Sequence, residues 1–316
     1  MAHAQTDSLQ AGGLVLSVRE DRALLELPGG EALRLKLPER AEISSLASLD
    51  RGGWAAAGSA TGEDGRRRLF VFTGDRSGSR PVPEPPGQRG VERSGAVLLV
   101  EDGRLVGLAW LEGDGGGALS VRAAAWDGQA WRTPEAISVP GPGSQLALTG
   151  AVLADGSWLL AWSAFDGKDD EIVWSRRTAE GWSPVRPMSD NAVPDVTPAL
   201  VFSGKNALIA WSRYDGHSYR LHLARFADGR WVDERVAAPA GSLFPSFQES
   251  EDGLYLLYRT AWPKGWTVQE IDGAGKALRE DSVLSGSPER PVIAGRSANG
   301  IRLRWISRER EKEKAQ

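Results

Sequence analysis

Aromatic and charged residues that could recognise a polar ligand concentrate in three short segments of the chain. Residues 165–171 place four carboxylates within six positions, residues 213–220 hold two of the four tyrosines, and residues 262–266 are bounded by two tryptophans. Aromatic rings stack on the CH faces of sugars, while carboxylates and arginines form charged hydrogen bonds with hydroxyl groups. We therefore predict a ligand-binding site made of Arg213, Tyr214, Asp215, His217, Tyr219, Trp262, Trp266, Asp169 and Glu171.

Catalytic and metal chemistry find less support in the same segments. A glycosidase needs two carboxylates ~5–5.5 Å or ~6.5–9.5 Å apart across a cleft. Such a pair could come from Asp166, Asp169, Asp195 and Asp215, but a chain with 42 acidic residues offers many coincidences. Three histidines are too few for a metal cluster, and the acidic segment lacks the alternating Asp order of a calcium loop. We predict no catalytic residue, no metal and no cofactor; plain solvated surface is an equally good interpretation of the acidic segment.

Composition excludes several classes of partner. The 38 basic and 42 acidic residues are interspersed and give a net charge of −4, so no basic face for nucleic acid or membrane surfaces is indicated. No stretch approaches the ~20 apolar residues of a membrane span. The absence of cysteine excludes disulfides, zinc thiolate sites and cysteine nucleophiles. We predict neither nucleic-acid binding nor membrane insertion.

The elements that must position the three segments follow a repeat of about fifty residues. Apolar runs end at anchor positions 58, 110, 162, 211, 258 and 305, so successive intervals are 52, 52, 49, 47 and 47 residues. Tryptophan occupies four of these anchors, and Gly58 and Tyr258 occupy the others. A period of this length built from short apolar runs is typical of a β-propeller, in which equivalent tryptophans pack between blades.

One copy illustrates the expected blade. An apolar run at 151–154 meets the hairpin pair Asp155–Gly156, and an apolar strand follows at 158–162. A polar loop leads to a third strand at 172–176, and a Glu–Gly turn leads to a fourth strand that starts at Trp182. The pattern predicts a four-stranded antiparallel meander.

The last copy stops after two strands, at Trp305, which raises the question of how the ring closes. Strands expected at 13–18, 22–27 and 31–37 would complete that blade and remove an exposed edge. We predict an all-β, six-bladed propeller over residues 13–307, with a flexible segment at 1–12 and a charged tail at 308–316. Seven blades is the alternative if the N-terminal strands form their own blade; six is favoured because no anchor precedes Gly58.

The expected connectivity places the two hairpins of each blade on one rim. The loops that follow the anchors and the connections between blades share the other rim, where the three ligand-binding segments lie. Because loops on a rigid scaffold commonly carry function, that rim is the expected binding face.

Three turn segments suggest a family. They are Ala224-Arg-Phe-Ala-Asp-Gly-Arg-Trp231, Ser175-Arg-Arg-Thr-Ala-Glu-Gly-Trp182 and Ala125-Trp-Asp-Gly-Gln-Ala-Trp131. These resemble, in degenerate form, the Asp-box repeats of the sialidase-like superfamily, which implies a six-bladed propeller and, for its enzymes, glycoside hydrolysis. The family's early Arg-Ile-Pro motif is absent and no tyrosine follows Tyr258, so the resemblance supports the fold and not the catalytic set. The segment from Trp126 to Trp131 also resembles the six-bladed fucose-binding lectins.

The start of the chain and the loop chemistry together give a functional hypothesis. Ala2-His3-Ala4 before Gln5 resembles the A-x-A end of a secretory signal, so we expect a periplasmic or secreted protein; a chance Ala-rich start is the alternative. The sequence favours an exported, non-catalytic recognition propeller whose ligand is a carbohydrate or a protein. A sialidase-like glycoside hydrolase and a protein–protein scaffold are the alternative functions.

Overall fold

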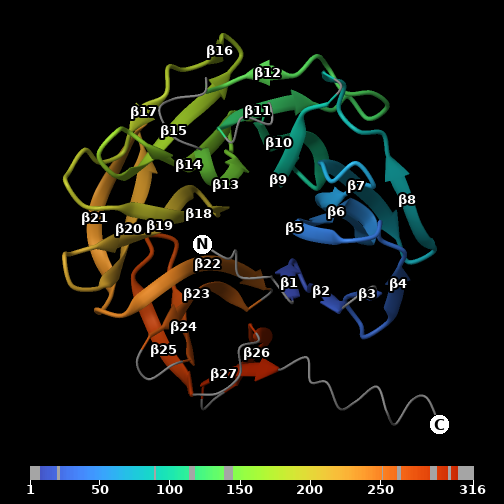
Figure 1. Ribbon diagram of the computed structural model, residues 1–316. Helices are drawn as coiled ribbons and strands as arrows, with labels where there is room; N and C mark the ends of the chain where they lie inside the picture. The colour runs from blue at the N-terminus through green and yellow to red at the C-terminus, as the bar shows by residue number, and fades with distance from the viewer. Residues whose placement is uncertain are drawn as a thin grey trace.

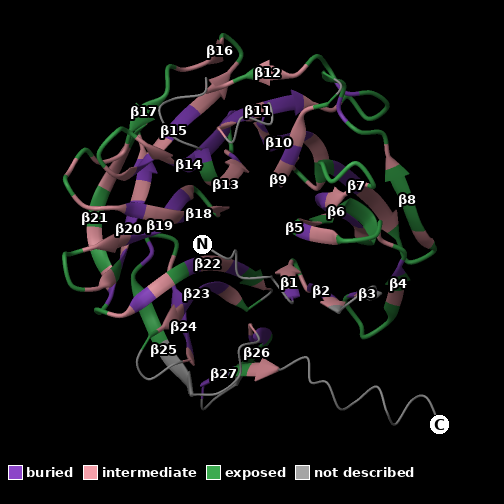
Figure 2. Cartoon of the chain, in the orientation of Figure 1, coloured by how far each residue is buried: buried purple, intermediate pink, exposed green. Residues whose placement is uncertain are grey.

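The computed structural model describes residues 8–19, 22–88, 90–113, 118–138, 145–250, 252–261, 265–284, 290–297 and 300–304. These residues form antiparallel sheets arranged around a central axis, with the first strand of each sheet nearest the axis (Figure 1). The only helical segment described is a 3₁₀ turn at Asp50–Gly52. Buried positions concentrate in the second and third strands of the sheets, whereas the outer strands are mostly exposed or half-buried (Figure 2).

Six sheets have the four strand positions of a propeller blade. Blade 1 contains β1 Ser8–Ala11, β2 Leu14–Arg19, β3 Arg22–Glu26 and β4 Ala32–Leu35. Blade 2 contains β5 Ala41–Leu49, β6 Gly53–Thr61, β7 Arg67–Asp75 and β8 Gly78–Val82. Blade 3 contains β9 Glu92–Glu101, β10 Arg104–Gly113, β11 Leu119–Ala125 and β12 Glu135–Ala136.

The remaining blades follow in chain order. Blade 4 contains β13 Gln145–Val152, β14 Trp158–Phe165, β15 Asp170–Thr178, and β16 Gly181–Trp182 with β17 Arg186–Pro187, which share the fourth position. Blade 5 contains β18 Asp195–Ser203, β19 Asn206–Tyr214, β20 Tyr219–Ala227 and β21 Arg230–Ala238. Blade 6 contains β22 Ser242–Ser250, β23 Gly253–Thr260, β24 Gly265–Ile271 and β25 Ala277–Leu284. The terminal sheet contains β26 Val292–Ser297 and β27 Gly300–Arg304. The predicted all-β architecture with six four-stranded blades is confirmed.

The predicted way of closing the ring is wrong. The N-terminal strands do not complete the last blade; they form blade 1. Its inner strand, β1, lies within the segment 1–12, which we expected to be flexible. Leu14, Leu16 and Leu25 give this blade its own buried core, which also packs against blade 2. The terminal sheet is separate, and Ile293 and Ile301 pack against blade 6. The predicted strand 31–37 is observed as β4, paired with β3, whereas Trp305 and the predicted tail 308–316 lie outside the described residues.

The anchor residues occupy equivalent positions in the second strands of the blades. Trp110, Trp162, Trp211 and Tyr258 are at most 1 % exposed, as expected for packing between blades. Each also has a polar partner: the indole nitrogens donate to Glu112, Gln145 and Asp195, and the Tyr258 hydroxyl accepts from Gln269. The anchors therefore combine apolar burial with a satisfied hydrogen bond.

A serine after the anchor ties each of two blades to the next one. The Ser163 hydroxyl accepts a hydrogen bond from the amide of Thr197 at 3.2 Å, and Ser212 accepts from the amide of Phe244 at 3.2 Å. Thr197 and Phe244 both have a φ of +54° and sit at a bulge in an inner strand. The bulge removes an amide from the strand ladder, and the serine of the preceding blade satisfies it.

The two rims follow from this connectivity. We call the rim with the hairpins between first and second and between third and fourth strands the hairpin rim. The loop rim carries the hairpins between second and third strands and the connections between blades (Figure 1).

Candidate functional site

The aspartates of the predicted binding loops shape their own turns. Asp166 accepts hydrogen bonds from the amides of Lys168 and Asp169 in the β14–β15 hairpin. Asp215 accepts from the amides of Ser218 and His217 in the β19–β20 hairpin, and these bonds together with Arg220 lower its pKa to about 2. Both hairpins lie on the loop rim, as predicted. Because one oxygen of each carboxylate is engaged by the turn, these aspartates are primarily turn formers.

The tyrosines of the second loop form a pair at the base of its hairpin. Tyr214 and Tyr219 are cross-strand partners whose ring centroids are 5.3 Å apart. Burial raises the pKa of Tyr219, and the charge of Asp170 on the neighbouring blade raises it further. The structure therefore brings the first two predicted segments together. His217 is exposed at the tip of the same hairpin.

The third predicted segment behaves differently. Trp262 lies outside the described residues. Trp266 belongs to strand β24 rather than to a loop, is 9 % exposed, and stacks with the Arg259 guanidinium 5.1 Å from its ring centroid. Expecting a loop position for Trp266 was wrong, because the strand begins earlier than the sequence pattern indicated, and packing accounts for this tryptophan.

Arg213 is held in an ion-pair network that extends from a buried acid to the surface. Its guanidinium donates to both oxygens of Asp195, at 2.7 and 2.8 Å, and to Glu234 at 2.7 Å. Asp195 is fully buried at the start of β18, where it also receives the Trp211 indole nitrogen. Glu234 is shared with His222, whose hydrogen bond lowers the pKa of Glu234.

The same device recurs in blade 3 with its charges exchanged. There Arg93 is on the inner strand, and it pairs with Glu112, two residues after the anchor Trp110, at 3.0 Å. In blade 5 the acid, Asp195, is on the inner strand, and Arg213 is two residues after the anchor. In both blades the guanidinium lies over the anchor ring, at 5.6 and 5.5 Å. A repeated position of this kind indicates that Arg213 stabilises the blade.

Glu171 is the most perturbed carboxyl of the predicted set. It is 3 % exposed, and burial raises its pKa from 4.5 to about 7, although hydrogen bonds from Asn191 and Ser189 oppose the shift. Burial likewise raises the pKa of Asp169 and of Asp170. Glu171 therefore lies inside the wall between blades 4 and 5, beneath the predicted binding surface.

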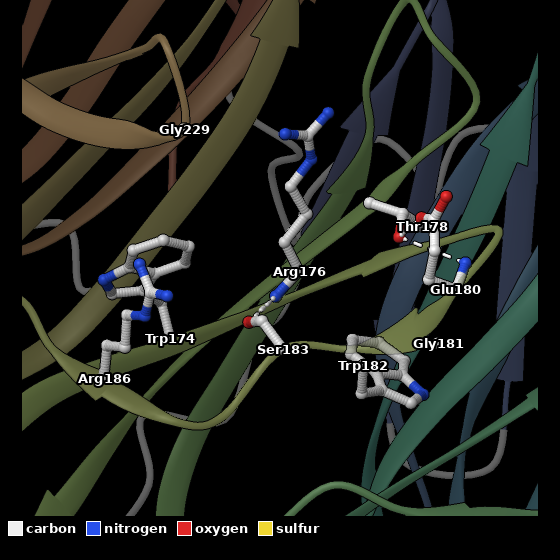
Figure 3. A pocket seen from close by; sticks show the side chains of 9 residues that line it. All are labelled: Trp174, Arg176, Thr178, Glu180, Gly181, Trp182, Ser183, Arg186 and Gly229. Carbon is white, nitrogen blue, oxygen red and sulfur yellow. Dashed lines mark hydrogen bonds between the residues drawn. The ribbon is translucent and has the colours of Figure 1, made fainter.

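A pocket that the sequence did not predict opens in the same seam, toward the hairpin rim (Figure 3). Its volume is about 300 Å³. The lining combines aromatic, basic and hydroxyl groups: Trp174, Arg176, Thr178, Glu180, Gly181, Trp182, Ser183, Arg186 and Gly229. All of these belong to blade 4 except Gly229, which comes from the β20–β21 hairpin of blade 5. No group of metal-ligating side chains occurs among the described residues.

The two arginines of the pocket have different partners. Arg176 donates to Ser157 at 2.9 Å and pairs with Asp155, so its charge is compensated. The Arg186 guanidinium lies 5.8 Å from the centroid of the Trp174 ring (Figure 3), and within the described residues it has no acidic partner. Glu180 is held by the hydroxyl of Thr178. Arg186, unlike Arg176, can therefore bind a ligand without breaking an existing ion pair.

An aromatic cluster forms the wall behind the pocket. Trp174 packs edge-on against Phe226 and Trp231 of blade 5, with centroids 5.4 and 6.4 Å apart. The sequence did contain a signal for this wall, because Trp174 and Trp231 fall outside the anchor positions. Their meeting depends on the angle between two blades, which the sequence pattern does not encode.

Comparison with known proteins gives the fold and no family. No protein-family model and no curated protein matches the chain. A protein of unknown function from Dyadobacter fermentans has a TM-score of 0.55 at 14 % identity, over 79 % of this chain and 86 % of that chain. The Aleuria aurantia lectin, a six-bladed β-propeller with a fucose recognition mode, has a TM-score of 0.51 at 13 % identity, over 89 % and 95 %.

A sialidase is also among the similar structures. The Hadza microbial sialidase Hz136 has a TM-score of 0.49 at 14 % identity, over 86 % of this chain and 66 % of that chain.

Among the described residues, no helix has the length and apolarity needed to cross a membrane. The similarity to the lectin, together with the blade topology, shows that this chain has the six-bladed β-propeller fold.

Proposed function

We propose that the protein is a non-catalytic recognition propeller that binds a carbohydrate in the pocket between blades 4 and 5. The observation that carries this proposal is the lining of that pocket, where Trp174, Arg186 and Ser183 face one cavity of about 300 Å³. Sugar sites commonly combine an aromatic or apolar surface with a few fixed polar groups. The fucose recognition of the fungal lectin is compatible with such a role for this fold.

The polar groups of the pocket suit hydroxyl and carboxylate oxygens. Arg186 offers a planar set of N–H donors, which can engage two ligand oxygens at once. The neighbouring Pro187 and the pairing of Arg186 with Trp174 across the β17–β15 ladder restrict the backbone that carries this donor. A preorganised donor loses less entropy on binding than a flexible one.

A catalytic role is disfavoured by the burial of two of the candidate acids. Glu171 and Asp195 are 3 % and 0 % exposed, and their oxygens are engaged by protein groups. A glycosidase pair must instead reach both faces of the scissile bond from a cleft. Asp166 and Asp215 are exposed, but each is committed to its own turn.

The loop rim remains the second candidate site. Tyr214 and Tyr219 pack together there, and the charge of Asp170 on the adjacent blade raises the pKa of Tyr219. His217 is at the exposed tip of the same hairpin. This surface could accept a sugar or a protein, and it keeps the predicted position of the ligand. Glycan binding by variants of Arg186 and Tyr214 distinguishes the two sites.

The test is glycan-array binding of the full chain, followed by calorimetric titration of the glycans that bind, with neutral and acidic sugars both included. We expect Arg186→Gln to weaken binding at least about tenfold while the melting temperature is unchanged. The matched control is Arg80→Gln, an exposed arginine on the outer strand of blade 2.

Each other outcome selects an alternative. Binding that survives Arg186→Gln but is lost in Tyr214→Ala moves the site to the loop rim. Turnover of fluorogenic glycosides, including a sialoside, would overturn the non-catalytic proposal in favour of a glycoside hydrolase. A chain that neither binds nor cleaves any glycan would contradict carbohydrate recognition and leave the protein–protein scaffold.

A further inference from the structure

Two buried carboxyl groups share one hydroxyl at the loop rim, away from the pocket. The hydroxyl oxygen of Ser189 lies 3.0 Å from one oxygen of Glu171 and 2.5 Å from one oxygen of Asp195. Glu171 belongs to blade 4 and Asp195 to blade 5. Ser189 is part of the connection 188–194, which joins the two blades and which we call the strap. Because a hydroxyl carries a single proton, it can donate to only one of the two carboxyls.

The hydrogen bonds around each acid show where an additional proton belongs. Asp195 receives two N–H groups of Arg213, the Trp211 indole nitrogen and the Asn191 side-chain amide, which together favour the charged carboxylate. Glu171 receives the main-chain amide of Asn191 at 2.8 Å on its other oxygen, and within the part of the chain that the structure describes it has no cationic partner. A protonated Glu171 can donate a hydrogen bond to the Ser189 hydroxyl, which then donates its own proton to Asp195. Both contacts of Ser189 are then hydrogen bonds.

We propose that Glu171, Ser189 and Asp195 form a proton-dependent lock between blades 4 and 5, closed while Glu171 holds a proton and released when that proton is lost. With Glu171 ionised, two buried carboxylates face one hydroxyl, and one of the two contacts becomes repulsive. The strap relieves the repulsion by moving outward, because Ser189 and Asn191 supply its contacts to both acids.

The charges around Glu171 act in the same direction as its burial. Asp169, in the hairpin before the strand of Glu171, and Asp195, on β18, both raise the pKa of Glu171. Asp170 begins the same strand and Asp190 is on the strap. Arg213 on β19 is the cation that contacts Asp195, but it is paired with Asp195 and Glu234, and Glu234 is paired in turn with His222. Lys168 is at the tip of the preceding hairpin, beside Asp166 and Asp169.

These surroundings place the transition in an accessible range. Burial raises the pKa of Glu171 to about 7, and the charges of Asp195 and Asp169 add to that effect. The lock is therefore closed in mildly acidic solution and released in mildly basic solution.

The strap also has a contact that limits how far it opens. The amide of Met188 donates to the carbonyl of Ile172 at 2.7 Å, at the end of the strap nearest blade 4. The side chain of Asn191 accepts from the amide of Val193 at 2.9 Å, so the middle of the strap is a compact turn. We expect the opening to involve residues 189–194 and to leave Met188 in place.

Hydrogen exchange of the full chain tests the lock. Amide protection of a peptide covering 188–194 is measured at about pH 5.5 and about pH 8.5, with the intrinsic pH dependence of exchange removed. We expect the wild-type protection factor to fall at least about tenfold at the higher pH. In Glu171→Gln, whose amide donates to Ser189 and accepts from Asn191 as the protonated acid does, protection should be high at both values.

The matched control is Asp170→Asn, which neutralises the neighbouring residue of the same strand and leaves the lock intact. It should retain the wild-type pH dependence of strap protection. Infrared spectroscopy of the wild-type protein gives an independent readout, since the carbonyl band of a protonated carboxyl should disappear between the two pH values. That measurement keeps the proposal testable if Glu171→Gln does not fold. The proposal is overturned if strap protection in the wild type does not depend on pH, or if Glu171→Gln keeps the wild-type dependence.

Discussion

The side chain of Gln10 pairs with the main chain of Ile293 in the way that one strand pairs with another. Its amide nitrogen donates to the Ile293 carbonyl at 2.8 Å, and its amide oxygen accepts from the Ile293 amide at 2.9 Å. The two residues are 283 positions apart and join blade 1 to the terminal sheet. Glu26 and Arg304 add an ion pair between the same elements. The ring is thus closed by side chains rather than by a shared sheet.

Removal of the Gln10 contact should destabilise the whole ring. Gln10→Ala leaves the amide and carbonyl of a buried residue without partners, and we expect a loss of ~1–3 kcal/mol in the free energy of unfolding. Gln10→Glu keeps an acceptor for the Ile293 amide but removes the donor to its carbonyl, so it should also destabilise. Urea denaturation measures both variants, with Gln129→Ala, at an exposed hairpin, as the control. A change below ~0.5 kcal/mol in Gln10→Ala would contradict a role in closure.

The sequence predicted the blades wherever an aromatic anchor marks the second strand. Blade 1 has no such anchor, because its second strand, β2, buries leucines such as Leu14 and Leu16 instead. Its inner strand is only four residues long and carries the polar Gln10 and Ser8. Without these two signals, the sequence favours assigning the N-terminal strands to the incomplete last repeat over a blade of their own, and the predicted closure is wrong.

The candidate site was less predictable for a related reason. The position of the two segments after the anchors Trp162 and Trp211 correctly located their hairpins on the loop rim, where Asp166 and Asp215 form the turns. The burial of Glu171 depends on the strap, which is folded over it by tertiary contacts. The pocket depends on the angle at which Gly229 approaches Trp174 across two blades. Neither relation leaves a periodic signal in one sequence.

The anchor tryptophans should contribute far more to stability than the loop aromatics. Trp162→Ala or Trp211→Ala removes a fully buried indole and leaves Gln145 or Asp195 without one hydrogen-bond donor, so we expect a loss of ~3–5 kcal/mol. Tyr214→Ala, on the loop rim, is the comparison and should cost much less. Thermal and chemical denaturation check both values. Equal losses in the two groups would mean that the loop aromatics are also core residues.

The buried ion pair of blade 5 should be sensitive to loss of one charge. Asp195→Asn leaves the Arg213 guanidinium with Glu234 as its only acid partner, and we expect a loss of ~3–5 kcal/mol, in the range measured when one partner of a buried pair is removed. Asp233→Asn breaks the exposed pair with Arg225 and should cost at most ~1 kcal/mol. Denaturation of both variants at neutral pH measures the two losses in the free energy of unfolding. Similar losses would show that pairing alone, and not burial, determines the contribution of an ion pair.

Stability should fall as the pH rises from mildly acidic to neutral. The folded-state pKa of Glu171, about 7, is above its ordinary value of 4.5, so the folded state holds a proton that the unfolded state has lost. The resulting stabilisation is complete below the lower value and is lost as the pH rises through the higher one. The raised pKa values of Asp169 and Asp170 act in the same direction. Melting curves across this window should show a shallower decline in Glu171→Gln, and an unchanged decline would assign the effect to other groups.

The ion pairs of blades 3 and 5 have opposite orders of charge, so the order found in blade 5 can be introduced into blade 3 by exchanging two residues. Arg93→Asp or Glu112→Arg alone places like charges opposite each other on β9 and β10, and each should destabilise the chain strongly. The double variant restores an opposite pair in the order found in blade 5, with the acid on the inner strand and the arginine two residues after the anchor. We expect it to be more stable than the sum of the single changes implies, by a coupling energy of ~1–3 kcal/mol in a double-mutant cycle.

Recovery of stability should be partial, because Arg93 also donates to the Pro85 carbonyl and Glu112 also pairs with Arg122. A coupling energy near zero would show that the two positions are not interchangeable and that the local strand geometry of each blade fixes the order of its charges.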